Sequence, residues 1–217
     1  MAGEISTLVD VLHALFASRR VPAPPGAADG ADALLGAFTA ASRRVGKAPL
    51  ALDADEMARL AEAGVDWPLA TRVDELWRVA LLLAAASRPD FTTLLATCFR
   101  GGDTDERRAV LRALPLLPDA ARFAPLAADA CRSSVQPIFE AIACENPYPA
   151  RHLAALHFEQ MVLKALFLNV ALARVVGLGA RRTPELARMA RDYAAERRAA
   201  GRAVSPDLAA LAGEASA

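Results

Sequence analysis

Apolar residues recur at helical spacing along nearly the whole chain, and no stretch alternates between polar and apolar residues as a half-buried strand does. Short segments with this spacing are separated by turns rich in Pro, Gly and Asp. Apolar residues make up 54% of the chain and aromatic residues only 6%, so a core must consist mainly of Ala, Leu and Val. Because Ala and Leu favour helices, we predict an all-α fold.

The predicted helices follow one another with short connections. They cover residues 6–17, 32–44, 53–64, 69–87, 89–100, 104–114, the segment after the turn at 117–119 up to 133, and then 137–144, 151–176, 183–200 and 205–212. Such a series is typical of helical hairpins of the HEAT type, and residues 105–119 resemble a HEAT half-repeat. No fixed period recurs, so we predict an irregular array of helical hairpins, a HEAT-like α-solenoid, with a compact helical bundle as the alternative.

The chain is long enough for one domain with a substantial core. We predict a single all-α domain over residues 1–212, followed by a frayed tail at 213–217. Within it, residues 1–88 are less regular, 89–144 are HEAT-like, and 144–200 contain the most unusual sequence. The helix at 69–87 is apolar on all sides near its end and should therefore be central.

Charge and cysteine content exclude several classes of protein. The 25 basic and 25 acidic side chains cancel, which argues against nucleic acid as a partner, because phosphate binding requires an excess of Lys and Arg. Cys98, Cys131 and Cys144 are far apart and lie among apolar residues, without the spacing of a zinc site. We expect buried free thiols, no metal and no cofactor.

The sequence argues against a membrane-spanning segment in two apolar stretches and against a signal peptide at the N-terminus. The run at 76–86 is too short to span a bilayer, and the longer stretch at 158–179 is interrupted by Glu159, Lys164, Asn169 and Arg174. The N-terminus carries Glu4 and Asp10 where a signal peptide has basic and apolar residues. These features predict a cytoplasmic protein.

The first candidate site is the segment Cys-Glu-Asn-Pro-Tyr-Pro-Ala-Arg-His at 144–152. Two prolines and an Asn before Pro147 predict a stiff, extended loop, and such loops often carry recognition residues. Glu145, Asn146, Tyr148 and His152 are therefore candidates. The alternative is a rigid connector in which Tyr148 packs on the core and Asn146 caps the next turn.

The second candidate site is the helix that follows, where His157, Gln160, Lys164 and Ala171 share one stripe. Nearly all cations of the chain are arginine, so Lys164 within an apolar helix is an exception. It is predicted either to pair with a carboxylate or snorkel to the surface, or to act as an anion-binding or reactive amine. Its possible carboxylate partners are Glu140, Glu145, Glu159 and Asp192.

Other residues carry weaker signals. Asn169 interrupts the apolar stretch, while Asp192 and Tyr193 lie in the next helix beside Glu196 and Arg197, where solvated ion pairs explain most of the pattern. The spacing of His152 and His157 does not place both on one helical face, which argues against a metal site. No P-loop, nucleophile elbow or dinucleotide-binding turn occurs in the sequence.

Four segments together resemble the EboA family: residues 144–152, Gln-Met-Val-Leu-Lys-Ala-Leu-Phe at 160–167, Pro-Glu-Leu-Ala-Arg-Met at 184–189, and Asp-Tyr-Ala-Ala-Glu-Arg at 192–197. The resemblance covers the last third of the chain and makes 144–200 an EboA-like segment. It implies a helical, HEAT-like fold and a component of a bacterial gene cluster for traffic of small secondary metabolites toward the periplasm. Protein partners would be encoded in the same cluster, a membrane prenyltransferase among the candidates.

The leading hypothesis is a non-enzymatic accessory or scaffold protein that binds a partner protein or a small amphiphilic metabolite on a helical face. It would be cytoplasmic, or peripheral to the inner membrane through a partner. The alternatives are an enzyme or enzyme subunit that acts on a prenylated or aromatic metabolite through Lys164 and a nearby carboxylate, and a purely structural helical repeat. The candidate binding residues are Glu145, Asn146, Tyr148, His152, Gln160, Lys164, Asn169, Asp192 and Tyr193.

Overall fold

The computed structural model describes residues 2–26 and 28–213, and their regular elements are helices, which confirms the all-α fold. The α-helices are α1 (Ala2–Ser18), α2 (Ala31–Val45), α3 (Ala54–Glu62), α4 (Val73–Ala85), α5 (Phe91–Gly101), α6 (Thr104–Ala113), α7 (Ala124–Arg132), α8 (Gln136–Ala143), α9 (Tyr148–His152), α10 (Ala155–Phe167), α11 (Pro184–Ala199) and α12 (Pro206–Ala212). Short 3-10 helices are η1 (Leu114–Leu116), η2 (Ala120–Phe123), η3 (Leu172–Arg174) and η4 (Gly179–Arg181). Helix α1 begins before its predicted start at Ser6.

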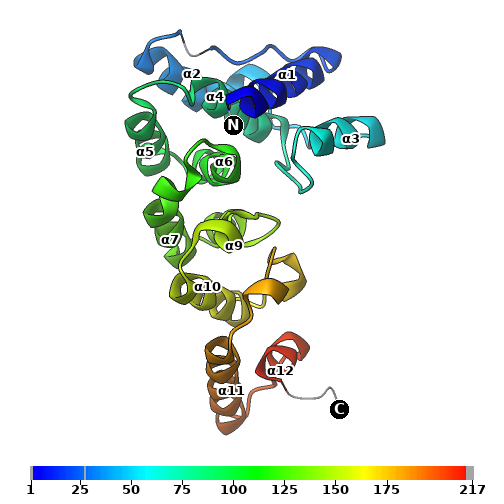
Figure 1. Ribbon diagram of the computed structural model, residues 1–217, viewed down its shortest axis with the longest axis vertical. Helices are drawn as coiled ribbons and strands as arrows, with labels where there is room; N and C mark the ends of the chain where they lie inside the picture. The colour runs from blue at the N-terminus through cyan, green and yellow to red at the C-terminus, as the bar shows by residue number, and fades with distance from the viewer. Residues whose placement is uncertain (1, 27, 214–217) are drawn as a thin grey trace.

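The helices form an elongated array, which runs from α1 and α2 at one end to α11 and α12 at the other (Figure 1). Helix α4 packs against α6, and α6 packs against α8. Beside this row, α5 contacts α6, α7 contacts α8, and α10 contacts both α7 and α8. Because each helix covers the apolar side of its neighbours, a hydrophobic cluster extends from Leu8 in α1 to Ala212 in α12.

Helix α4 is buried along almost its whole length, as its apolar sequence predicts. It also buries charge. The Arg78 guanidinium donates to the Phe38 carbonyl over 2.9 Å and to the Asp74 carboxylate over 2.7 Å. A buried charge is tolerated when it is paired and its hydrogen bonds are made, so these side chains bind α4 to α2 rather than leaving it open to solvent.

Two helices begin with a capping box that was partly visible in the sequence. At α3, the Glu56 amide donates to Asp53 over 2.8 Å and the Asp53 amide donates back to Glu56 over 3.0 Å. Asp103 and Glu106 repeat this arrangement at α6. These reciprocal bonds satisfy backbone donors that have no partner within the helix, which is why acidic residues mark both helix starts.

The predicted helix over 151–176 is wrong. Its residues form the end of α9, then α10, then η3. Asn169 adopts a left-handed φ of 56°. Its amide donates to the Leu166 carbonyl over 3.1 Å, and the Val170 amide donates to the Ala165 carbonyl over 2.8 Å. This is a Schellman motif, and Asn tolerates the left-handed position better than most residues, so it ends α10.

Some expectations fall outside these observations. The predicted frayed tail at 213–217 lies, apart from Gly213, outside the described residues. A HEAT-type repeat and the division into one domain stay predictions. In the part of the chain that the structure describes, no helix combines the length and the apolar character that crossing a membrane requires. The three cysteines are buried free thiols, as predicted.

Candidate functional site

Residues 144–152, which we name the α8–α9 junction, are held inside the protein by Asn146. Its side-chain amide donates to the carbonyls of Leu111 and Ala141 over 3.1 and 3.0 Å, and its oxygen accepts from the Tyr148 amide over 2.9 Å. Only 1% of Asn146 is exposed. The side chain therefore joins α6 and α8 to the start of α9, and none of its bonds faces a ligand.

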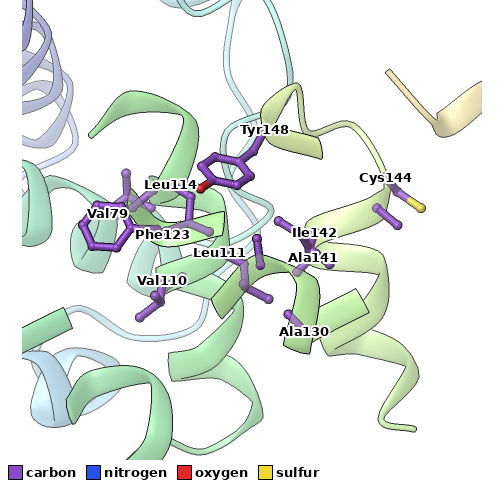
Figure 2. Packing of buried hydrophobic residues seen from close by; sticks show 14 of the residues in the cluster. Val79, Val110, Leu111, Leu114, Phe123, Ala130, Ala141, Ile142, Cys144 and Tyr148 are labelled. Atoms are coloured by element: carbon purple, nitrogen blue, oxygen red, sulfur yellow. The ribbon is translucent and has the colours of Figure 1, made fainter. Parts of the chain in front are cut away.

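Tyr148 is fully buried in the same junction. Its hydroxyl donates to the Ala120 carbonyl over 2.6 Å, and Figure 2 shows its ring pointing toward Leu114 and Phe123. Burial raises the pKa of the Tyr148 phenol above its ordinary value. The half-buried His152 ring lies against it, with ring centroids 4.8 Å apart, and burial lowers the pKa of that imidazole.

The expectation of an extended loop is wrong from Tyr148 onward, because Tyr148 opens the single turn of α9. Asn146 accounts for this change: by accepting from the Tyr148 amide it starts a helical turn locally. The contacts are those of the rigid connector, with Tyr148 on the core and Asn146 capping the turn. Neither side chain reaches the surface face on which they were expected to bind a partner.

Glu145 belongs to an ion cluster at the edge of the junction. Arg174 donates to Glu145 over 2.6 Å and to Glu140 over 2.7 Å. Both hydrogen bonds raise the pKa of the guanidinium, and Arg174 in turn lowers the pKa of Glu140. The buried Arg112 donates to the Cys144 and Glu145 carbonyls over 2.8 and 3.1 Å. These arginines, which sequence reasoning did not select, fasten α6 and η3 to the junction.

Gln160 and Lys164 do share a face of α10 with His157, as their spacing predicted. Together with Cys131 and Arg132 of α7 they line a hollow of about 290 Å³. Lys164 donates to the carbonyls of Cys131 and Ser133 over 3.0 and 2.6 Å. Its ammonium thus caps the C-terminal end of α7, where a positive charge is favoured by the helix dipole.

The predicted ion pair of Lys164 is not what holds it. Among the described residues, no carboxylate lies within ion-pair distance of its ammonium. Three of the expected partners pair with arginines instead: Glu140 and Glu145 with Arg174, and Asp192 with Arg188. Glu159 instead accepts from the Thr183 hydroxyl over 2.6 Å. The backbone carbonyls at the end of α7 are nonlocal partners, which helical spacing alone cannot indicate. Burial lowers the pKa of Lys164.

The remaining candidates lie apart from each other. Asn169 is exposed beside a small hollow that it shares with Asp207, and its backbone ends α10. Asp192 is an exposed partner of Arg188. The half-buried Tyr193 ring lies 6.4 Å from the ring of Phe167, measured between centroids. The structure therefore distributes the nine predicted residues over the α8–α9 junction, the α10 face, the exposed Asn169 and Asp192, and the half-buried Tyr193.

Two larger hollows meet at α1, and sequence reasoning missed both. The first, which we name the α1–α9 groove, has a volume of about 530 Å³ and lies between α1, the end of α3, the η1 turn and α9. It is mostly apolar, with Leu8, Trp67 and Leu116 in its lining, and it includes the charged side chains of Glu62 and Arg151. The Arg151 guanidinium lies over the Trp67 ring at 5.2 Å, a distance typical of a cation–π contact.

The second, the α1–α4 hollow, has a volume of about 540 Å³. Ile5, Val9 and His13 line it from α1, and residues 83–87 close it at the end of α4. Among the side chains that the structure describes, its lining includes no Lys, Arg, Asp or Glu, and it shares Ile5 and Pro118 with the α1–α9 groove. The two hollows are therefore neighbours of different polarity. Pockets of this size, mostly apolar with few polar groups, are typical small-molecule sites.

The three cysteine thiols are buried and hold their protons. Burial raises the pKa of the Cys98 and Cys131 thiols to about 12 and that of the Cys144 thiol to about 11. All three are therefore protonated at neutral pH, whereas the thiolate is the reactive form. Across the described ranges, no group of three or more His, Cys, Asp or Glu side chains is placed to hold a metal ion.

A family model described as "Metabolite traffic protein EboA" matches residues 27–213. The match covers α2 to α12, including Trp67, Pro118 and Arg151, whereas α1 precedes it. Neither the curated proteins nor the solved structures contain a significant match to the chain.

Proposed function

Because the chain belongs to the EboA family of metabolite traffic proteins, we propose that it is a non-enzymatic protein that binds a small amphiphilic metabolite at the two hollows around α1. The α1–α9 groove would take the polar end of the metabolite, and the α1–α4 hollow would take the apolar part. This proposal keeps the leading function suggested by the sequence but places the site at α1 instead of at the α8–α9 junction and the Gln160 and Lys164 face of α10.

The observation that carries the proposal is that two hollows of different polarity share two of their lining residues. The two hollows have similar volumes, about 530 and 540 Å³, and Ile5 and Pro118 line both of them. Arg151 provides hydrogen-bond donors on the groove side, and no ion-pair partner for it is present among the described residues. A molecule with one polar and one apolar end matches this arrangement.

The alternative is an enzyme that uses Lys164. The lowered pKa of this amine and the hollow of about 290 Å³ beside it favour that alternative. However, two of the three ammonium protons are donated to backbone carbonyls, which suits a helix cap better than a nucleophile. We therefore rank the enzyme second.

The binding proposal can be tested with 1-pyrenebutyrate, an amphiphile with a fluorescent apolar ring and a carboxylate. We expect saturable binding with quenching of tryptophan emission, because Trp67 lines the groove. Arg151→Met should weaken binding about fivefold to tenfold, the loss expected for a charge-assisted hydrogen bond. Val9→Trp should weaken it at least as much by filling the α1–α4 hollow.

The matched control is Arg122→Met, since Arg122 is also an exposed arginine over an aromatic ring but lines neither hollow. It should leave the affinity unchanged. Lys164→Met should also leave it unchanged, because Lys164 lines a different hollow. Absence of saturable binding would refute the proposal, as would equal affinities of Arg151→Met, Val9→Trp and the unaltered protein.

For localisation and partners, we infer that the protein works in the cytoplasm and is held at the inner membrane by a protein encoded in the same gene cluster, with a membrane prenyltransferase as the candidate. Support comes from large apolar side chains on α10 that remain exposed: Leu156 at 56% and Phe167 at 67%. Affinity capture from native cells tests this. Phe167→Ser should abolish recovery of cluster-encoded proteins, and Met57→Ser, at an exposed apolar position on α3, should not.

A further inference from the structure

A third hollow lies between helix α3 and the segments that precede and follow it, and we name it the α3 hollow. It has a volume of about 540 Å³. Buried and half-buried leucines line it, and so does Met57, a large apolar side chain that remains 53% exposed. Among the described residues of its lining, Asp66 is the one with a charged side chain, and it is exposed. The α3 hollow therefore offers an apolar surface that is open to solvent at Met57.

The walls of the α3 hollow are held in place by backbone hydrogen bonds. On one side, the Leu50 amide donates to the Thr71 carbonyl over 2.9 Å and so joins the segment before α3 to the segment after it. On the other side, the Val65 amide donates to the Leu60 carbonyl over 2.8 Å, across a turn in which Gly64 adopts a left-handed φ of 85°. Because these walls are anchored, little order has to be created when a ligand binds.

The three hollows form a row with the α1–α9 groove in the middle. Trp67 lines both the groove and the α3 hollow. Ile5 and Pro118 line both the groove and the α1–α4 hollow. The two outer hollows, in contrast, have no lining residue in common among the residues that the structure describes. The groove therefore lies between two apolar hollows, one on each side.

The polar groups of this row are concentrated in its middle. The exposed Arg151 lies over the Trp67 ring at 5.2 Å, beside the residue that the groove shares with the α3 hollow. Its guanidinium can donate to an acceptor on a ligand. Glu62 lines the same groove, and its carboxylate would repel a second negative charge on the ligand. A polar group with at most one negative charge therefore suits the groove, and apolar groups suit the hollows on both sides.

We propose that the α3 hollow is a further part of the binding site and holds a second apolar arm of the metabolite. The ligand is then a molecule with two apolar arms and one polar group, such as a carboxylate, between them. The polar group lies in the α1–α9 groove beside Arg151, one arm lies in the α1–α4 hollow, and the other passes Trp67 into the α3 hollow. The two outer hollows, each of about 540 Å³, admit arms of similar size. The inference rests on the proposed function and adds the shape of the ligand.

The test compares 2-hexyloctanoate with tetradecanoate, which are isomers with the same charge. The first carries its carboxylate between two hexyl arms, and the second carries it at the end of a single chain. Tetradecanoate cannot place its carboxylate in the groove and also fill both outer hollows. In isothermal titration calorimetry below the micelle-forming concentrations, the unaltered protein should bind 2-hexyloctanoate about tenfold more tightly, the effect of burying roughly two more methylene groups.

Filling the α3 hollow should remove this preference. Ala61 is exposed and lines the hollow, so Ala61→Trp places a bulky ring at its opening. This variant should bind the two isomers equally. The matched control is Ala58→Trp, at an exposed alanine on the same helix that lines none of the three hollows, and it should keep the preference.

A second measurement does not depend on a variant that folds. In the unaltered protein with ¹³C-labelled methionine methyl groups, the Met57 resonance should shift on addition of 2-hexyloctanoate, because Met57 lines the α3 hollow. The Met161 resonance should stay in place, because Met161 is buried beside Lys164 in a different hollow. Equal affinities of the unaltered protein for the two isomers, or a Met57 resonance that 2-hexyloctanoate leaves unmoved, would overturn the inference about the α3 hollow.

The results also separate this inference from the proposed function. If 1-pyrenebutyrate binds in the manner described above but the unaltered protein does not prefer 2-hexyloctanoate to tetradecanoate, the proposed function stands and the role of the α3 hollow is refuted. If none of the three probes binds, the proposed function fails, and the inference fails with it.

Discussion

The α8–α9 junction and the α1–α4 hollow both place polar side chains among apolar ones, but they differ in whether the buried polar atoms have hydrogen-bond partners. In the junction, Asn146 makes three hydrogen bonds and the Tyr148 hydroxyl makes one, all to backbone groups. Beside the hollow, the buried Nε2 atom of His13 makes none. The junction is filled with protein, whereas the hollow has a volume of about 540 Å³.

This difference separates polar groups that stabilise the fold from a buried polar group that lowers its stability. An unusual polar segment within a helical protein suggests a binding site, and on that ground the sequence predicts one at 144–152. Asn146 and Tyr148 are buried and donate their hydrogen bonds inside the protein, so neither side chain is open to a ligand. A buried atom without a partner, such as His13 Nε2, lowers the stability of the folded protein. The predictions below test whether the two regions differ in this way.

The largest change in the free energy of unfolding is expected for a substitution of Asn146. Asn146→Ala removes three buried hydrogen bonds and leaves the Leu111 and Ala141 carbonyls and the Tyr148 amide without this partner. We expect the free energy of unfolding to fall by about 3 kcal/mol in urea denaturation. Gln160→Ala, at an exposed position on α10, should change it by less than about 0.5 kcal/mol. A similar, small change in both variants would contradict a structural role for the junction.

A smaller loss is expected at Tyr148. Tyr148→Phe keeps the buried ring but removes the donor to the Ala120 carbonyl. The free energy of unfolding should fall by about 1 to 2 kcal/mol, because the carbonyl stays buried without this bond. Tyr193→Phe is the matched control at a half-buried tyrosine and should cost less. If Tyr148→Phe changes the affinity for 1-pyrenebutyrate while stability stays constant, the junction belongs to the site after all.

At His13 the free energy of unfolding should rise on substitution, whereas it falls at Asn146 and Tyr148. His13→Leu replaces a buried nitrogen without a partner by apolar atoms, so the free energy of unfolding of the unliganded protein should rise, by about 1 kcal/mol. Thermal unfolding followed by circular dichroism measures the change. His157→Leu should give no such gain, because no buried unpartnered nitrogen is found at His157. Destabilisation by His13→Leu would mean that the imidazole makes contacts that stabilise the fold despite its unpartnered nitrogen.

The smallest change in stability is expected from partly exposed ion pairs, which lie outside both the junction and the hollow. Arg72 and Lys47 lower the pKa of Asp105 to about 2 from an ordinary value of 3.8. A lowered carboxyl pKa stabilises the folded state above the ordinary value, and this contribution is lost as the pH falls toward 2. The difference in stability between the unaltered protein and Asp105→Asn should therefore shrink from pH 5 to about pH 2. A difference that is constant with pH would contradict the pairing.

Much of the local structure was predictable from the sequence. Helical spacing predicted the all-α fold, the buried α4, and the shared face of Gln160 and Lys164 on α10. The acidic residues at 53 and 56 indicated a helix start that the structure shows as a capping box. These features depend on residues within one turn of each other, so the sequence contains all the information they require.

The tertiary structure alone decided which polar side chains find hydrogen-bond partners within the protein and where hollows remain between the helices. Asn146 meets Leu111, and Lys164 meets the end of α7, through contacts between residues far apart in the chain. The hollows at α1 likewise combine residues 5–13, 62–67, 83–87, 115–118 and 151. Helix periodicity is a local property that sequence spacing encodes directly. The partner of a hydrogen bond and the volume left between helices depend on how separate helices pack, and spacing along the chain does not specify that packing.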